Sequence, residues 1–276
     1  MNDELVQLIS RANIVSPSPV AIDLLRLLCD RRYSRARFVK LVRQDPATST
    51  ALLRAASMTS VSRSRSSIDI DEAVARLGAK RVRRIVVEQA FGALKIERLD
   101  GYGIEDHAFW RMSVSCAHAS EEIARAAGLD EGIMYIVGML LDIGKLALEA
   151  CLGDRMVSIG GRPDQLEREA TGFNHEEIGA QIATAWNLSE PIPTCIRYHH
   201  DPADARCLEA EVACAHLASW AVHWLGIPTG FDGMLYDLDT RVLDALGLSE
   251  GSVEEIALAV LEGIQSTEEP TPTPIS

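Results

Sequence analysis

Apolar residues recur every three or four positions along most of the chain, which is the spacing of helices with one buried face. The two-residue alternation typical of strands does not persist for more than a few residues. The pattern therefore predicts an all-α fold. The expected helices, in chain order, are Val20–Leu28, Ala47–Met58, Asp71–Leu77, Lys80–Leu94, Glu105–Ala127, Glu131–Cys151, Asp164–Ala170, Asn174–Trp186, Glu190–His200, Cys207–Leu225, Asp239–Leu246 and Ser252–Ile264.

Capping residues indicate where several of these helices begin or end. Ser18 and Asp45 each precede a proline, so each is expected to cap a helix whose first residue is that proline. Asn174 is followed three positions later by Glu177, the spacing of a capping box. Gly78 follows an apolar helical pattern and is expected to end it.

Breaks in the pattern divide the chain. The Gly101-Tyr102-Gly103 segment interrupts the helices and predicts a lobe boundary. We therefore expect an N-terminal helical lobe over residues 1–100, packed on a helical bundle over residues 101–264. Residues 265–276 are rich in Thr and Pro and cannot bury apolar surface, so they are expected to form a disordered tail.

Composition places the chain among ordinary globular proteins, but its charge is uneven. It has 276 residues, 47% hydrophobic and 24% charged, with a net charge of −13. Residues 1–100 contain 18 Lys/Arg and 11 Asp/Glu, a net charge of +7, and the remaining residues have a net charge of −20. This asymmetry is consistent with an anionic partner for the basic lobe, and equally with attraction between the two lobes.

The cysteines and the lack of long apolar runs indicate in which compartment of the cell the protein is expected. The six cysteines form no CxxC pair and lie mostly in apolar helical patterns, as reduced thiols do. No apolar run approaches ~18 residues without charge, so no membrane segment is expected. The acidic start of the chain does not have the pattern of a signal peptide. Together these features predict a cytoplasmic protein.

An acidic residue within an apolar run is the first candidate for chemistry. Asp142 lies between Ile133 and Leu148, where an unpaired carboxylate would be costly. Lys145, three positions later, is the expected partner if the role of Asp142 is structural.

Three histidines are further candidates. His175 shares a helix face with apolar residues, and His199 and His200 end a helix, where a protonated imidazole favours the helix dipole. With Asp142 they are expected either to line a pocket that binds an anion or a metal, or to be satisfied interior and capping residues. The second interpretation is favoured because ligand sites are rare.

Basic residues concentrate in the N-terminal lobe. The candidates for a basic surface are Arg63, Arg65, Arg81, Arg83 and Arg84. Nucleic-acid binding would use such charges on phosphates with the help of stacking aromatics, but aromatic residues are nearly absent from this region. A solvated face or a docking surface for an acidic protein is the favoured interpretation, and nucleic-acid binding stays as an alternative.

Several ordered motifs resemble the HDOD family, the HD-related output domain. They are Leu41–Ala47, Leu52–Ser57, Asp71–Gly78, Trp110–Ser113, Gly138–Leu146, Asn174–Ala180 and Arg197–Pro202. The resemblance covers about residues 17–225. It implies a helical lobe followed by a degenerate HD-type bundle, and a stand-alone role in bacterial signal transduction.

The resemblance also argues against catalysis. The positions of two metal-binding histidines and a late aspartate of active HD enzymes fall on Met112, Leu141 and Ser219, and Asp142 alone is retained. We therefore expect no enzyme activity, bound metal or cofactor. The expected function is signalling through contacts with a protein partner. The protein is also expected to be able to sense a small anionic ligand. The alternatives are a metal-dependent phosphohydrolase with unusual ligands and a nucleic-acid-binding regulator.

Overall fold

Helices account for nearly all regular structure in the described part of the chain. The computed structural model describes residues 17–30, 32–59, 68–92, 94, 98–105, 107–152, 162–227 and 236–265. Within these ranges the only extended pairing is one isolated bridge between Leu99 and Ile104. The prediction of an all-α fold is therefore confirmed. Among the described helices, none is both long and apolar enough to cross a membrane.

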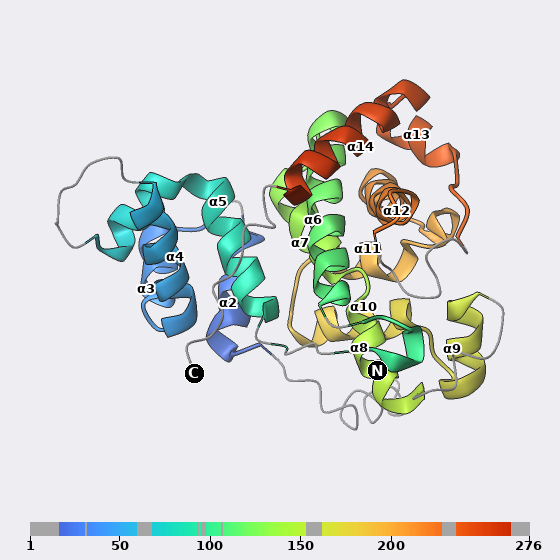
Figure 1. The fold of residues 1–276 in the computed structure, drawn as a ribbon, viewed down its shortest axis with the longest axis horizontal. Coiled ribbons are helices and arrows are strands. Elements are labelled where there is room, and N and C mark those ends of the chain that lie inside the picture. Colours follow the sequence, from blue (N-terminus) through green and yellow to red (C-terminus); the bar gives the residue numbers. More distant parts are fainter. Residues whose placement is uncertain are drawn as a thin grey trace.

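The N-terminal helices form a group of their own, seen at the left of Figure 1. They are α2 (Pro19–Leu28), α3 (Arg35–Val42), α4 (Pro46–Met58) and α5 (Ile70–Gly92). Inside α5 the backbone of Gly78 has a φ of 75°, a left-handed conformation that glycine adopts without strain. The helix end predicted at this residue is thus present as a kink between two helical halves.

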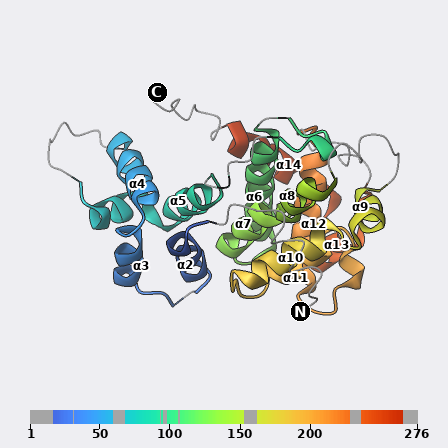
Figure 2. The ribbon, with the colours of Figure 1, turned by 90° about the horizontal axis from the view of Figure 1, so that it is seen from below.

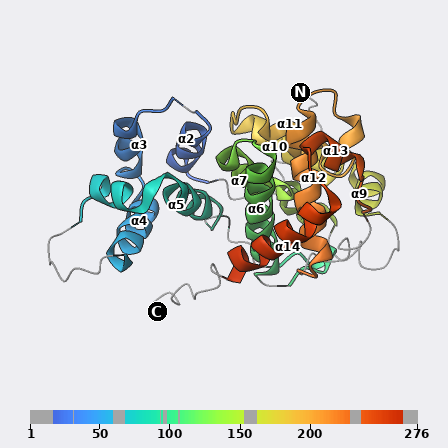
Figure 3. The ribbon, with the colours of Figure 1, turned by 90° about the horizontal axis from the view of Figure 1, so that it is seen from above.

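The second group is a larger bundle, in which α6, α7 and α12 lie side by side in Figures 1–3. Its elements are the 3-10 turn η1 (Asp100–Tyr102), α6 (Ala108–Ala127), α7 (Glu131–Leu140), α8 (Ile143–Leu152), α9 (Pro163–Thr171), α10 (His175–Ala185), α11 (Ile192–Tyr198), the 3-10 turn η3 (Pro202–Asp204), α12 (Glu209–Trp224), α13 (Arg241–Leu246) and α14 (Glu250–Gln265). The expected arrangement, a helical lobe packed on an HD-type bundle, is confirmed.

The predicted caps form as the sequence indicates. Ser18 Oγ accepts from the amide of Ala21 at 3.0 Å, and Asp45 Oδ2 accepts from that of Thr48 at 3.1 Å. Asn174 also makes both hydrogen bonds of the capping box. Helix α3 was not predicted, because only three of its eight residues are buried and its basic residues mask that short pattern.

One predicted helix is in fact two. The apolar pattern from Glu131 to Cys151 predicts a continuous helix, but α7 ends at Leu140 and α8 begins at Ile143. The bend lets α8 pack closely on α10: a Cβ on Gly144 would lie 1.9 Å from the carbonyl oxygen of His175. The bend therefore results from tertiary packing, which the periodicity of one segment does not contain.

Polar contacts join the two groups of helices. Glu121 on α6 is almost fully buried and pairs with Arg84 and, at 3.3 Å, with Lys80, both on α5. The Arg84 guanidinium also lies over the ring of Tyr135, and the hydroxyl of Tyr135 donates to Glu88 at 3.2 Å. The N-terminal lobe is thus attached to α6 and α7 partly through charged groups.

His118 beside these contacts gives the folded state a pH dependence. It is 1% exposed, and burial, with Arg84 and Lys80 nearby, lowers its pKa to about 4. In the unfolded chain the imidazole takes up its proton near pH 6.5, so stability falls as the pH drops from 6.5 toward 4. Between pH 7 and pH 5 the natural chain should lose about 2 kcal/mol more than His118→Gln in urea unfolding. Equal losses in the two proteins would contradict this prediction.

Candidate metal centre

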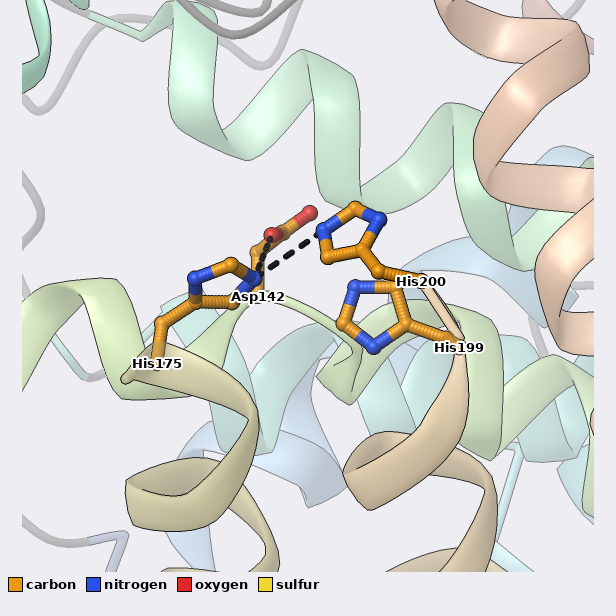
Figure 4. Close-up of side chains that lie close together, drawn as sticks. All are labelled: Asp142, His175, His199 and His200. Atoms are coloured by element: carbon orange, nitrogen blue, oxygen red, sulfur yellow. Dashed lines mark hydrogen bonds and ion pairs between the residues drawn. The ribbon is translucent and has the colours of Figure 1, made fainter. Parts of the chain in front are cut away.

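Four residues from three segments meet inside the bundle. Asp142 precedes α8, His175 is the first residue of α10, and His199 and His200 directly follow α11. Figure 4 shows their side chains pointing toward one another. All four are buried, and each offers one nitrogen or oxygen such that no two of these atoms are more than 4.8 Å apart. The structure thus brings together all four residues that the sequence singled out.

The ring of His175 is fixed by Glu167 on α9. The carboxylate of Glu167 lies 2.8 Å from Nδ1 of His175 and also accepts from its backbone amide at 2.7 Å. The hydroxyl of Tyr102 donates to the same carboxylate at 2.8 Å. Burial disfavours a charge here, but the Glu167 carboxylate raises the pKa of His175 to about 9. Nε2 of His175 faces inward, 3.1 Å from Nε2 of His200.

His199 and His200 are neutral, so each can offer a nitrogen lone pair. Burial lowers the pKa of His199 to about 3, and burial together with His199 and His175 holds that of His200 well below its usual value. The cost of burial thus exceeds the favourable effect of the helix dipole at this helix end.

The orientation of His199 leaves one nitrogen without a partner. Its Nδ1 lies 2.8 Å from the carbonyl oxygen of Ile196, which can only accept, so Nδ1 holds the hydrogen. Nε2 then has a free lone pair, and it is buried with no hydrogen-bond partner among the described residues. Such an orphaned buried acceptor is costly unless something binds it.

Asp142 has the predicted lysine partner. Nζ of Lys145 lies 2.8 Å from Oδ1 of Asp142, and the lysine side chain is fully buried. Burial opposes ionisation, but Lys145 and then His175 hold the pKa of this carboxyl well below its usual range. The carboxylates of Asp142 and Glu167 are thus matched by two buried cations, Lys145 and His175.

The four residues fit a divalent transition-metal ion. Imidazole nitrogens with one carboxylate oxygen are a common donor set for zinc, iron, nickel and related ions. Neighbouring donors about 2.1 Å from one ion lie roughly 3.0–3.4 Å apart. The two Nε2 atoms of His175 and His200 meet this spacing at 3.1 Å, whereas Nε2 of His175 lies 3.7 Å from Oδ1 of Asp142. The four ligand atoms as a group lie within 4.8 Å of one another, so a bound ion would draw them closer together. Contacts of Nδ1 with a carboxylate or a carbonyl, as in His175 and His199, are typical of metal-binding histidines.

The three positions where the resemblance places missing ligands are filled by other buried residues. Met112 lies on α6, Leu141 between α7 and α8, and Ser219 on α12. None of these three positions belongs to the group formed by Asp142, His175, His199 and His200. The sequence did not single out Glu167, because a carboxylate eight residues before His175 carries no recognisable spacing.

The basic candidates separate into different environments. Arg81 is exposed, whereas Arg83 and Arg84 are half-buried against α6 and α7. The Arg83 guanidinium occupies the space beside Gly132 that a Cβ there would need. Arg63 and Arg65 lie outside the described residues, as does most of the predicted tail, residues 266–276.

Comparison with known proteins identifies the family. The HDOD domain matches residues 14–202, which is most of the chain. The protein belongs to the HDOD family. This HDOD protein is 26% identical over 193 residues to an uncharacterized protein of Treponema pallidum (strain Nichols), a match that covers 65% of this chain. The match covers only 37% of that relative, so this chain spans little more than a third of its length.

Solved structures share the fold. An HDOD domain protein with unknown function from Geobacter sulfurreducens superposes with a TM-score of 0.71 and 19% identity, covering 97% of this chain and 99% of that one. A protein from Marinobacter aquaeolei VT8, described provisionally as a signal transduction protein, gives a TM-score of 0.75 and 20% identity over 96% of this chain and 64% of that one. At these identities the likeness establishes the HDOD fold alone.

Proposed function

We propose that this HDOD protein is a non-catalytic signalling protein that binds one divalent transition-metal ion and acts through contacts with a protein partner. Asp142, His175, His199 and His200 would hold the ion. The observation that carries the metal proposal is Nε2 of His199, a buried lone pair directed toward Asp142, His175 and His200. Binding of a cation would satisfy this atom, which has no hydrogen-bond partner among the described residues. An ion bound at Nε2 of His175 would displace the proton that this imidazole carries.

The number of protein donors favours binding over hydrolysis. Zinc sites with four protein ligands are usually structural, whereas catalytic sites keep one position open for water. The cluster supplies four donors, and Met112, Leu141 and Ser219 supply none of the further ligands that the HD resemblance implies. A bound ion would then stabilise the arrangement of α8, α10 and α11, so the metal content would control the surface offered to a partner.

Metal titration tests this proposal directly. Chelator-treated protein should take up about one Zn²⁺ per chain, measured by calorimetry and elemental analysis. Loss of a second-shell partner alone typically costs ~10–100-fold in metal affinity, so His199→Gln should lose at least ~100-fold. His223→Gln is the matched control, because His223 is bound through Nδ1 to a backbone carbonyl but lies outside the cluster.

Two results would contradict the proposal in different ways. Failure of the natural chain to bind Zn²⁺, Mn²⁺ or Fe²⁺ would remove the metal centre. Turnover of a phosphodiester by the metal-loaded protein, abolished in His199→Gln, would favour the alternative of a phosphohydrolase with unusual ligands.

The nucleic-acid alternative has less support. Two of the candidate arginines, Arg83 and Arg84, make contacts within the chain. Of the three candidates that the structure describes, Arg81 is the exposed one. Salt-dependent DNA or RNA binding that is lost in Arg81→Ala would support it.

A further inference from the structure

A polar cavity adjoins the candidate metal centre. It has a volume of about 410 Å³, and His200 belongs both to its lining and to the four-residue cluster. The charged residues of the lining are Asp201, Asp204, Asp237, Asp239, Arg162 and Arg241. His200 therefore connects the cavity with the buried donor atoms of the cluster.

The lining carries a net negative charge, because four aspartates line it and only two arginines do, both of them already paired. Arg162 lies 3.0 Å from Asp164 and 3.2 Å from Asp201, and Arg241 lies 2.6 Å from Asp239. The other two lining carboxylates, Asp204 and Asp237, are exposed and make no ion pair with any described residue. A concave surface with excess negative charge concentrates cations and repels phosphate groups.

The ring of Tyr236 lines this cavity and covers the ring of His200. It stacks on His200 with ring centroids 3.5 Å apart and planes only 4° from parallel. The Arg162 guanidinium lies over the tyrosine ring, 5.1 Å from its centroid, and the tyrosine hydroxyl donates to Asp164 at 3.3 Å. One face of the His200 imidazole is thus covered by the tyrosine ring on the side of the cavity.

We propose that the cavity is the entrance through which a divalent cation reaches the cluster, and that the side chain of Tyr236 must move aside for the ion to pass. This inference rests on the proposed metal binding and adds how the ion is selected and exchanged. The exposed carboxylates of Asp204 and Asp237 attract the cation electrostatically. The stacked ring then sets the rate of uptake and release, so the metal content changes slowly once it is established.

Stopped-flow measurements with Co²⁺ test the ring, with visible absorbance as the readout of binding. Tyr236→Ala should raise both the association and the dissociation rate about 10-fold, because the passage is open in both directions. Tyr236→Phe keeps the stacked ring and loses only the hydrogen bond to Asp164, so its rates should stay within about threefold of the natural chain. Unchanged rates in Tyr236→Ala would overturn the proposed gate.

The charge of the entrance is tested separately. The double variant Asp204→Asn/Asp237→Asn should slow Co²⁺ association about 3–10-fold at low salt, and the difference should shrink as added salt screens the carboxylates. Glu105→Gln/Glu190→Gln removes two exposed carboxylates that do not line the cavity, so it should keep the natural rate.

Measurements of Co²⁺ association and of Co²⁺ binding at equilibrium test the entrance and the metal centre separately. Equal association rates for the two double variants, with normal Co²⁺ binding at equilibrium, would overturn the entrance and leave the metal centre in place. A natural chain that binds no Co²⁺ at equilibrium would overturn the metal centre and the entrance with it.

Discussion

Replacing Lys145 with Met will make the stability of this HDOD protein depend on a divalent cation. The lysine ammonium lies 2.8 Å from Oδ1 of Asp142, and both side chains are buried. Removing one partner of a buried ion pair leaves an uncompensated charge, which typically costs about 3–5 kcal/mol. Lys145→Met should therefore melt roughly 10 °C below the natural chain when no metal is present. Saturating Zn²⁺ should recover much of this loss, because the ion replaces the missing positive charge beside Asp142.

A second variant separates the charge effect from lost packing. In Asp142→Asn/Lys145→Met neither charge is present, so this protein should be more stable without metal than Lys145→Met alone. It should also gain little from Zn²⁺, because its carboxylate ligand is lost. The measurements are thermal melts of all three proteins with chelator and with Zn²⁺. The explanation fails if Zn²⁺ raises the melting temperature of Lys145→Met no more than that of the natural chain.

Local signals explain which parts of the fold the sequence could predict. Caps at Ser18, Asp45 and Asn174 depend on hydrogen bonds within a few residues, and all three form as expected. The separation of α7 from α8 depends on how closely Gly144 approaches α10, which is far away in sequence. The solvent-facing position expected for Arg84 was also wrong, because α6 and α7 supply Glu121 and Tyr135 on that side of α5.

The four residues of the candidate site could be singled out from the sequence, but their meeting at one point could not. Taken one at a time, Asp142, His175, His199 and His200 are each more consistent with ordinary buried residues than with ligands, and Asp142 does have the lysine partner that this interpretation predicts. Their convergence is a property of three segments brought together by folding. The tautomer of His199 depends on the carbonyl of Ile196, and such a contact cannot be read from composition or periodicity.

Gly144→Ala will disrupt both the fold and the metal centre. A Cβ at this position would lie 1.9 Å from the carbonyl oxygen of His175 and 2.8 Å from the amide nitrogen of Gly179. Both neighbours are backbone atoms of α10, so no side chain can rotate away and the two helices must separate. Overpacking of this kind typically costs about 1–3 kcal/mol and occasionally more, and we expect the upper end here. Because His175 is the residue displaced, Zn²⁺ affinity should also fall at least 10-fold.

Gly92→Ala provides the control for the same chemical change. Gly92 is an exposed residue at the end of α5, and a Cβ there would meet nothing within 4 Å. Alanine favours the helix by up to about 1 kcal/mol over glycine, so this variant should be as stable as the natural chain or slightly more stable. Its Zn²⁺ affinity should not change, because α5 supplies no ligand. Equal stability and equal Zn²⁺ affinity in Gly144→Ala and Gly92→Ala would show that the close approach of α8 to α10 does not position His175.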